Sequence, residues 1–157
     1  MEQAIEYEIY DILKKRQLTL TTAESATGGM IAARLTNVPG ISAHFTEGYI
    51  TYSNEAKVKM IHVNPATIET YGVVSAETAA EMARAAALVA GADAAVSVTG
   101  VAGPGGGTRE CPVGRVFIGC TLLGETVTEK HTFSGDRNRV RQQAAQAALS
   151  LLRKQLS

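Results

Sequence analysis

Apolar residues along the chain recur with two different periods, which predict alternating helices and strands. From Ile5 to Leu13 they return every four positions among charged residues, the spacing of an amphipathic helix over about residues 2–15. Residues 18–23 then alternate between apolar and polar, which indicates a strand. A helical pattern follows over about residues 28–36.

The rest of the chain continues this alternation of helices and strands. We expect a strand over 45–52, a short helix after Ser53, a brief turn opened by Asn64-Pro65, a long helix from Ser75 to near Gly91, a strand over 95–98, an antiparallel strand pair over 115–123 and 126–133, and a final helix from Asp136 to about residue 154. This order favours an α/β fold, a three-layer α/β/α sandwich with a mixed central sheet, because helices on both faces of one sheet bury many amphipathic helices. We expect a single domain over residues 1–157.

Ligands of such sheets bind beyond the strand ends, among the loops that follow them. Three loops fit this description, at residues 25–29, 99–107 and 134–139. We therefore expect functional residues to lie in these three loops.

Charge and composition narrow the classes of partner. The 157 residues carry fifteen basic and fifteen acidic side chains, so no excess charge favours a nucleic acid or an anionic membrane. The apolar stretches are too short to span a bilayer, and the first residues lack the features of a signal peptide. We therefore expect a cytoplasmic protein. Cys111 and Cys120 form neither a disulfide framework nor a metal-binding spacing, and we expect no metal.

Ser25 stands at the junction between the first predicted strand and the helix after it. The first turn of a helix leaves N–H groups unpaired and carries partial positive charge, so a nucleophile there has an anion site beside it. Thr27, Gly28 and Gly29 follow directly and are candidates for an oxyanion hole or an anion cradle. The alternative is a simple helix cap, the more common role of serine at such a position.

Lys57 is the candidate base for such a serine. It lies in the first turns of a predicted helix, shortly after Tyr52 at the end of a strand. A lysine takes a proton only when it is neutral, which requires burial or nearby positive charge. Tyr52 would then orient the proton or anchor a substrate. Composition alone favours the alternative that Lys57 is an exposed surface lysine.

The segment from Val98 to Gly107 is rich in glycine, which lets a backbone approach a ligand closely. Thr99 and Gly100 stand where this loop leaves a buried strand. The segment is neither a Walker loop nor a dinucleotide fingerprint, because no Gly-Lys-Ser/Thr follows it and the next element is a strand. A flexible connection between strands is the equally plain alternative.

Three arginines open the last predicted helix. Arg137 and Arg141 share one helical face, and Arg139 points elsewhere. An arginine near a helix start suits phosphate or carboxylate recognition, whereas solvation remains the alternative for Arg137 and Arg141.

Other catalytic chemistries fit less well. The three histidines lie in different elements, and no Gly-x-Ser-x-Gly elbow surrounds Ser25, which disfavours a Ser-His-Asp hydrolase. A phosphoryl-transfer enzyme is disfavoured because the sequence has no Gly-Lys-Ser/Thr and no clear pair of metal-binding carboxylates.

Six segments together resemble the C-terminal domain of the competence-damage-inducible CinA proteins, the nicotinamide-nucleotide amidase family. They are Thr22-Ala-Glu-Ser-Ala-Thr-Gly-Gly29, Thr51-Tyr-Ser-Asn-Glu-Ala-Lys57, Gly72-Val-Val-Ser75, Thr99-Gly-Val-Ala-Gly-Pro104, Pro112-Val-Gly114 and Phe133-Ser-Gly-Asp-Arg137. They occur in the family's order and cover nearly the whole chain, which makes the ordered set specific.

The resemblance implies hydrolysis of the amide of nicotinamide mononucleotide, giving nicotinic acid mononucleotide and ammonia. It assigns the nucleophile to Ser25, its base to Lys57 and a third catalytic position to Tyr52. Thr99 and Arg139 match positions implicated in the site, and Arg139 would hold the substrate phosphate or another anionic part of the substrate. No cofactor or metal is implied. The expected partner is the small-molecule substrate, with a homo-oligomer possible.

Two departures from the family accompany the resemblance. The sequence does not include the N-terminal nucleotide-hydrolase-like domain of full-length members, so we expect any pyrophosphatase activity of that domain to be absent. Cys111 stands where we expect a lysine before the proline, which alters the charge of that loop.

A different class of function is a nucleotide-binding accessory or sensor protein without turnover. It would keep the glycine-rich loop and Arg139 but would not need Ser25 together with Lys57. The presence of both favours an enzyme.

Overall fold

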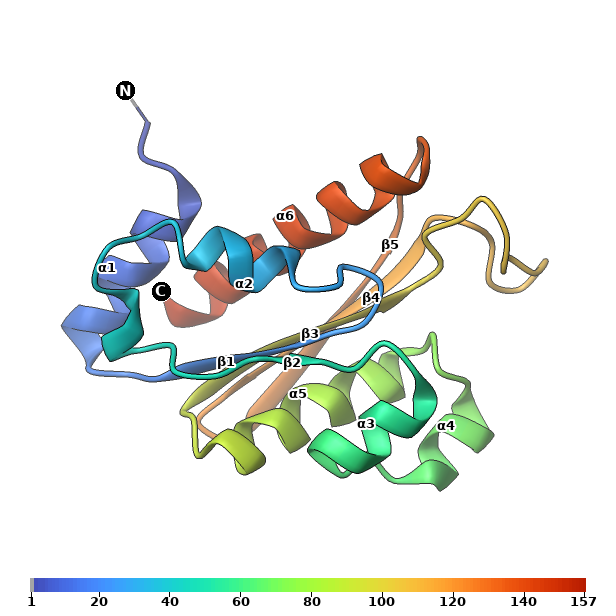
Figure 1. The fold of residues 1–157 in the computed structure, drawn as a ribbon, viewed down its shortest axis with the longest axis horizontal. Helices are drawn as coiled ribbons and strands as arrows, with labels where there is room; N and C mark the ends of the chain where they lie inside the picture. Colours follow the sequence, from blue (N-terminus) through green and yellow to red (C-terminus); the bar gives the residue numbers. More distant parts are fainter. Residues whose placement is uncertain (1) are drawn as a thin grey trace.

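The computed structural model describes residues 2–157 and shows one five-stranded sheet between two layers of helices (Figure 1). The strands are β1 (Leu20–Glu24), β2 (Tyr49–Ile50), β3 (Ala94–Gly100), β4 (Arg115–Leu122) and β5 (Glu125–Thr132). Their order in the sheet is β2-β1-β3-β4-β5; β2, β1 and β3 pair in parallel, and the β3–β4 and β4–β5 pairs are antiparallel. The predicted three-layer sandwich with a mixed sheet is confirmed.

The α-helices lie in one layer on each side of the sheet (Figure 1). One face carries α1 (Ile5–Arg16), α2 (Met30–Leu35) and α6 (Arg137–Leu156), and the other carries α3 (Asn54–Ile61), α4 (Pro65–Tyr71) and α5 (Ala76–Ala90). A short 3₁₀ turn, Ile41–Ala43, lies between α2 and β2. No helix in the described part of the chain has a long enough apolar stretch to cross a bilayer.

Two apolar cores result, one on each face of the sheet. The larger core joins α1 and α6 to the strands through fully buried side chains such as Ile9, Leu13 and Leu149. The smaller core is rich in alanine, because α5 packs very close to the sheet. A Cβ atom at Gly119 of β4 would lie 2.4 Å from the carbonyl oxygen of Ala79 in α5, so only glycine permits this approach.

The second strand is much shorter than its sequence predicts. The alternation over 45–52 indicated one continuous strand, but only Tyr49 and Ile50 form β2, with an isolated bridge at Phe45. Between them the hydroxyl of Thr21 donates to the Glu47 carbonyl at 2.8 Å, so a side chain replaces a backbone ladder bond. The residues before β2 do alternate, but at Glu47 the hydrogen-bond donor is the Thr21 side chain rather than a backbone N–H.

The turn expected at Asn64-Pro65 is longer than predicted, because it is the seven-residue helix α4. Asn64 accepts a hydrogen bond from the Ala66 N–H, and Pro65 occupies the first helical position, where its missing N–H costs nothing. The other elements lie within a few residues of their predicted bounds.

The three parallel strands all end at the same edge of the sheet. Ser25 follows β1, Tyr52 follows β2, and Thr99 lies at the end of β3. The topology therefore gathers residues from three distant sequence segments at the carboxyl ends of the strands, the usual ligand edge of such sheets.

Candidate active site

Ser25 and Lys57 come from different elements and are in direct contact. Ser25 directly follows β1, and Lys57 is the fourth residue of α3. The Lys57 Nζ atom lies 3.1 Å from the Ser25 Oγ atom. Both residues are buried, and the Lys57 side chain has an exposed fraction of 0%.

The start of α3 places the lysine at this point. Ser53 caps the helix, since its hydroxyl accepts a hydrogen bond from the Ala56 N–H at 3.0 Å. Side chains of an α-helix lean toward its N-terminus, so Lys57 extends back over the first turn toward Ser25. A cap and a helical turn thus aim the amine at the hydroxyl.

The surroundings of the Lys57 amine suit its neutral form. Burial, opposed by the Glu55 carboxylate, lowers the pKa of Lys57 from 10.5 to about 8. Within residues 2–157 no carboxylate forms an ion pair with Lys57. Its remaining polar contacts are the carbonyl oxygens of Thr51 at 2.8 Å and Ser53 at 3.4 Å.

As an ammonium, Lys57 donates to all three oxygens, those of Ser25, Thr51 and Ser53, whereas as a neutral amine it has two N–H bonds and one lone pair to place among them. The carbonyls of Thr51 and Ser53 accept the two N–H groups. The lone pair is then left for the Ser25 hydroxyl, 3.1 Å away. An arrangement of this kind lets Lys57 remove the serine proton.

The buried carboxylate of Glu24 occupies the start of α2. One of its oxygens accepts hydrogen bonds from the Thr27 hydroxyl at 2.7 Å and the Ile31 N–H at 2.9 Å, and the other accepts from the Ala32 N–H at 3.0 Å. Glu24 itself is 1% exposed. The helix start was expected to offer free donors to an anion, but Glu24 already uses two of them.

The turn after Ser25 retains other backbone donors. The Gly28 N–H donates to the Ser25 carbonyl at 3.0 Å and closes the turn. Within residues 2–157 the N–H groups of Ala26 and Thr27 have no backbone or side-chain acceptor. Ala26 lines the pocket beside Ser25, whereas Thr27, Gly28 and Gly29 do not. Of these two unpaired donors, Thr27 was among the predicted residues and Ala26 was not.

A pocket of about 310 Å³ opens over the Ser25–Lys57 pair. Tyr52 and Asn54 line one wall, and the loop that follows β3, including Thr99, Gly100 and Gly103, lines another. All three predicted loops thus contribute residues to this pocket, and the third contributes Arg137.

Tyr52 faces this pocket but does not reach the buried pair. The Tyr52 side chain is 58% exposed, and its hydroxyl oxygen accepts a hydrogen bond from Arg137 at 2.7 Å. Within the described residues no hydrogen bond links Tyr52 to Ser25 or Lys57. Its position suits contact with a ligand rather than a proton relay.

The arginine at the pocket is Arg137, not the expected Arg139. Arg137 also donates to the Gly103 carbonyl at 2.7 Å, which ties the start of α6 to the loop after β3. Arg139 lines a separate hollow with Ser134 and Gln143. The helical spacing placed Arg137 and Arg139 on different faces, but it did not indicate which of the two faces the pocket.

Thr99 and Gly100 serve the pocket in different ways. The Thr99 hydroxyl donates to the Val73 carbonyl at 2.8 Å and holds the segment before α5 against the end of β3. At Gly100 a Cβ atom would lie 2.7 Å from the side chain of Val116, so this glycine is required by packing against β4.

Cys111 lies farther along the same loop and does not line the pocket. Burial, opposed by the nearby Arg115, raises the pKa of the Cys111 thiol. The thiol is therefore a poor nucleophile at neutral pH. Residues 2–157 contain no cluster of three or more metal-ligating His, Cys, Asp or Glu side chains.

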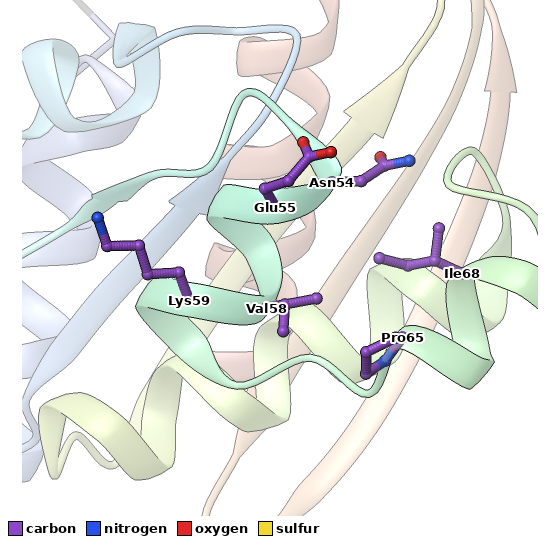
Figure 2. Close-up of a pocket in the computed structure, with 6 residues that line it drawn as sticks. All are labelled: Asn54, Glu55, Val58, Lys59, Pro65 and Ile68. Carbon is purple, nitrogen blue, oxygen red and sulfur yellow. The ribbon is translucent and has the colours of Figure 1, made fainter.

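A second hollow lies between α3 and α4 (Figure 2). Its floor is apolar, from Val58, Pro65 and Ile68, with Glu55 and Lys59 also in its lining. Asn54 borders both this hollow and the Ser25 pocket. Its lining has no buried nucleophile with a base beside it, unlike the lining of the Ser25 pocket.

Comparison with known families finds one match that covers the chain. The family model of the CinA C-terminal domain matches residues 2–156. A protein of Alkaliphilus metalliredigens that is named as competence-damage inducible is 56% identical to this chain over 145 residues, which are 92% of this chain and 35% of that protein. A CinA-like protein of Kosmotoga olearia is 48% identical over 155 residues, 99% of this chain and 38% of that protein. The chain thus spans little more than a third of these relatives.

Solved structures share the whole fold. A competence damage-inducible protein A from Klebsiella pneumoniae superposes with a TM-score of 0.93 at 36% identity, over 97% of this chain and 94% of that one. A CinA superfamily protein from Enterobacter cloacae gives a TM-score of 0.94 at 30% identity, over 100% and 96% of the two chains.

Proposed function

Because the chain belongs to the CinA C-terminal domain family, we propose that it is an amidohydrolase that converts nicotinamide mononucleotide and water to nicotinic acid mononucleotide and ammonia. The observation that carries this proposal is the buried contact between Lys57 Nζ and Ser25 Oγ at 3.1 Å. A lysine whose pKa is lowered to about 8 is a competent base near neutral pH. A binding protein has no need of such a pair.

The reaction begins with proton transfer from the Ser25 hydroxyl to the neutral Lys57 amine. The Ser25 oxygen attacks the carboxamide carbon and forms a tetrahedral intermediate with a negative oxygen. Ala26 and Thr27 are the two residues that follow Ser25, their N–H groups have no protein acceptor within residues 2–157, and these groups would stabilise that oxygen. Lys57 returns the proton to the nitrogen, and ammonia leaves.

Water completes the cycle. With Lys57 neutral again, the amine accepts a proton from water as it attacks the acyl-serine carbonyl. The ester bond to Ser25 breaks, the proton returns to the serine oxygen, and the acid is released. Apart from the Thr27 N–H, the groups used in these steps belong to residues that line the pocket, namely Ser25, Ala26 and Lys57.

The pocket also offers groups for the rest of the nucleotide. The guanidinium of Arg137 lies at the pocket with two of its nitrogens bound to Gly103 and Tyr52, which fixes its direction. A fixed guanidinium is suited to a phosphate. The exposed ring of Tyr52 offers a flat apolar surface to a pyridine or ribose ring.

The proposal is tested by incubating the purified chain with nicotinamide mononucleotide and measuring ammonia and nicotinic acid mononucleotide. We expect the two products in equal amounts. Lys57→Ala should lose the activity, and Lys59→Ala, which removes an exposed lysine of the same helix, should keep it. A folded wild-type protein that releases no ammonia would contradict the proposal.

The same experiment examines the alternative of an accessory or sensor protein. Such a protein would bind nicotinamide mononucleotide, as calorimetry would detect, without forming either product. The Ser25–Lys57 contact favours the enzyme, because neither residue is needed for nucleotide binding alone.

A further inference from the structure

Arg141 holds the turn that carries Ser25 without lining the pocket. It lies in α6, one helical turn after Arg137. Its Nε atom donates to the Ala26 carbonyl at 2.9 Å, and its Nη2 atom donates to the Thr27 carbonyl at 3.3 Å. Arg141 is absent from the residues around the pocket, so its effect on Ser25 must pass through the backbone.

Peptide planarity turns this contact into control of a backbone donor. In a planar trans peptide the C=O and the following N–H point in opposite directions. Because the Ala26 carbonyl points at Arg141, the Thr27 N–H must point away from α6. In Figure 1, α6 lies on one face of the sheet and α3, which carries Lys57, on the other. The Thr27 N–H therefore does not point into the layer of α6, and it belongs to the peptide that joins Thr27 to the pocket residue Ala26.

The turn is held from its other side as well. The Glu24 carboxylate binds the Thr27 hydroxyl at 2.7 Å. Gly28, at φ +58°, gives the guanidinium room, since a Cβ atom there would lie 3.3 Å from Arg141 Nη2. A buried carboxylate and a guanidinium thus fix one short turn between them.

We propose that Arg141 is a positioning residue, which fixes the peptide after Ala26 so that the Thr27 N–H stays ready to stabilise the oxyanion. The inference rests on the proposed function, because it takes Ser25 as the nucleophile. Removing the guanidinium frees the peptide to rotate, which weakens binding of the transition state but not of the substrate. Loss of one oxyanion donor lowers kcat by about 10²-fold in other hydrolases.

The test compares the steady-state kinetics of Arg141→Ala and wild type on nicotinamide mononucleotide. We expect kcat to fall by about 10²-fold with KM within about twofold. The acid limb of the pH profile should not move, because Arg141 does not contact Lys57. Arg141→Lys, which keeps one donor in place of the fork, should recover part of kcat. Arg84→Ala, which removes an exposed arginine of α5, is the matched control.

A second readout does not depend on the substrate. Diisopropyl fluorophosphate labels an activated serine: the Ser25 Oγ–P bond forms, the P–F bond breaks, fluoride leaves and Lys57 takes the proton. The same backbone donors stabilise the phosphoryl oxygen, so the labelling rate should also fall in Arg141→Ala. If urea denaturation shows that Arg141→Ala is not folded, both the kinetics and the labelling rate are measured on Arg141→Lys instead.

The outcomes separate this inference from the proposed function. Wild-type values of kcat and labelling rate in a folded Arg141→Ala would overturn the inference, as would a raised KM with unchanged kcat. A wild type that labels at Ser25 but releases no ammonia would overturn the proposed substrate and leave the labelling rates to decide the role of Arg141. A wild type that shows neither reaction would overturn both.

Discussion

Burying a lysine without a carboxylate partner costs free energy when the amine is charged. Within the described part of the chain Lys57 is such a lysine, and it lies beside the proposed nucleophile Ser25. Burial alone would make the ammonium form unfavourable, and the fold supplies two carbonyls rather than a counter-ion. Burial without a counter-ion in residues 2–157 lowers the pKa of Lys57 to about 8, close to neutral pH. Perturbed groups of this kind gather at functional sites.

The pH dependence of kcat/KM should report this lysine. Only neutral Lys57 accepts the serine proton, so kcat/KM should rise tenfold per pH unit below about 8 and level off above it. The Glu55 carboxylate raises the pKa of Lys57, and Glu55→Gln should therefore move the acid limb to lower pH. Glu69→Gln, which removes an exposed carboxylate of α4, serves as the control. A profile that is flat from pH 6 to 9 would contradict this assignment.

The arginines at the start of α6 should differ in their effect on substrate binding. Arg137 lies at the pocket and Arg139 at a separate hollow, so Arg137→Ala should raise KM for nicotinamide mononucleotide far more than Arg139→Ala does. A lost guanidinium–phosphate contact corresponds to about tenfold or more in KM. Steady-state kinetics of the two variants checks this, and a larger effect from Arg139→Ala would restore the assignment made from the resemblance.

At the scale of elements, periodicity predicted most of the fold, because long amphipathic helices and buried strands have clear patterns. The exceptions have local causes. β2 is short because the Thr21 hydroxyl binds the Glu47 carbonyl, a contact with no periodic signal. Likewise Glu24, the last residue of β1, accepts hydrogen bonds from the first turn of α2, and this contact depends on how the chain turns between the two elements. Patterns of apolar residues carry no information on such contacts.

The packing of α5 on the sheet should depend on a single glycine. Gly119→Ala places a Cβ atom against the Ala79 carbonyl and the Ser97 hydroxyl, at 2.4 and 2.6 Å in the present geometry. α5 must then move away, and we expect a loss of about 1–3 kcal/mol in the free energy of unfolding. Urea denaturation measures the loss. Gly105→Ala, where a Cβ atom meets open space, should leave the stability unchanged, and equal stabilities for the two variants would contradict this packing.

For the whole molecule, topology is what joins Ser25 to Lys57 across 32 positions of sequence. The order of motifs identified both residues through resemblance, whereas their contact follows from parallel strands that end at one edge. The sequence could not reveal that Arg137 rather than Arg139 reaches the pocket, since this depends on where α6 begins relative to the loop after β3. Nor could the sequence reveal that Arg141 binds the turn after Ser25, because this contact joins residues 115 positions apart.

The most direct test of the account compares ammonia release from nicotinamide mononucleotide by wild type and Ser25→Ala under saturating substrate. Removal of the nucleophile should lower the rate by about 10⁴-fold or more, as in other serine hydrolases. The substitution deletes one oxygen atom, so the fold should survive, and matched urea midpoints would establish this. A folded Ser25→Ala that releases ammonia at a rate near that of wild type would contradict the central claim.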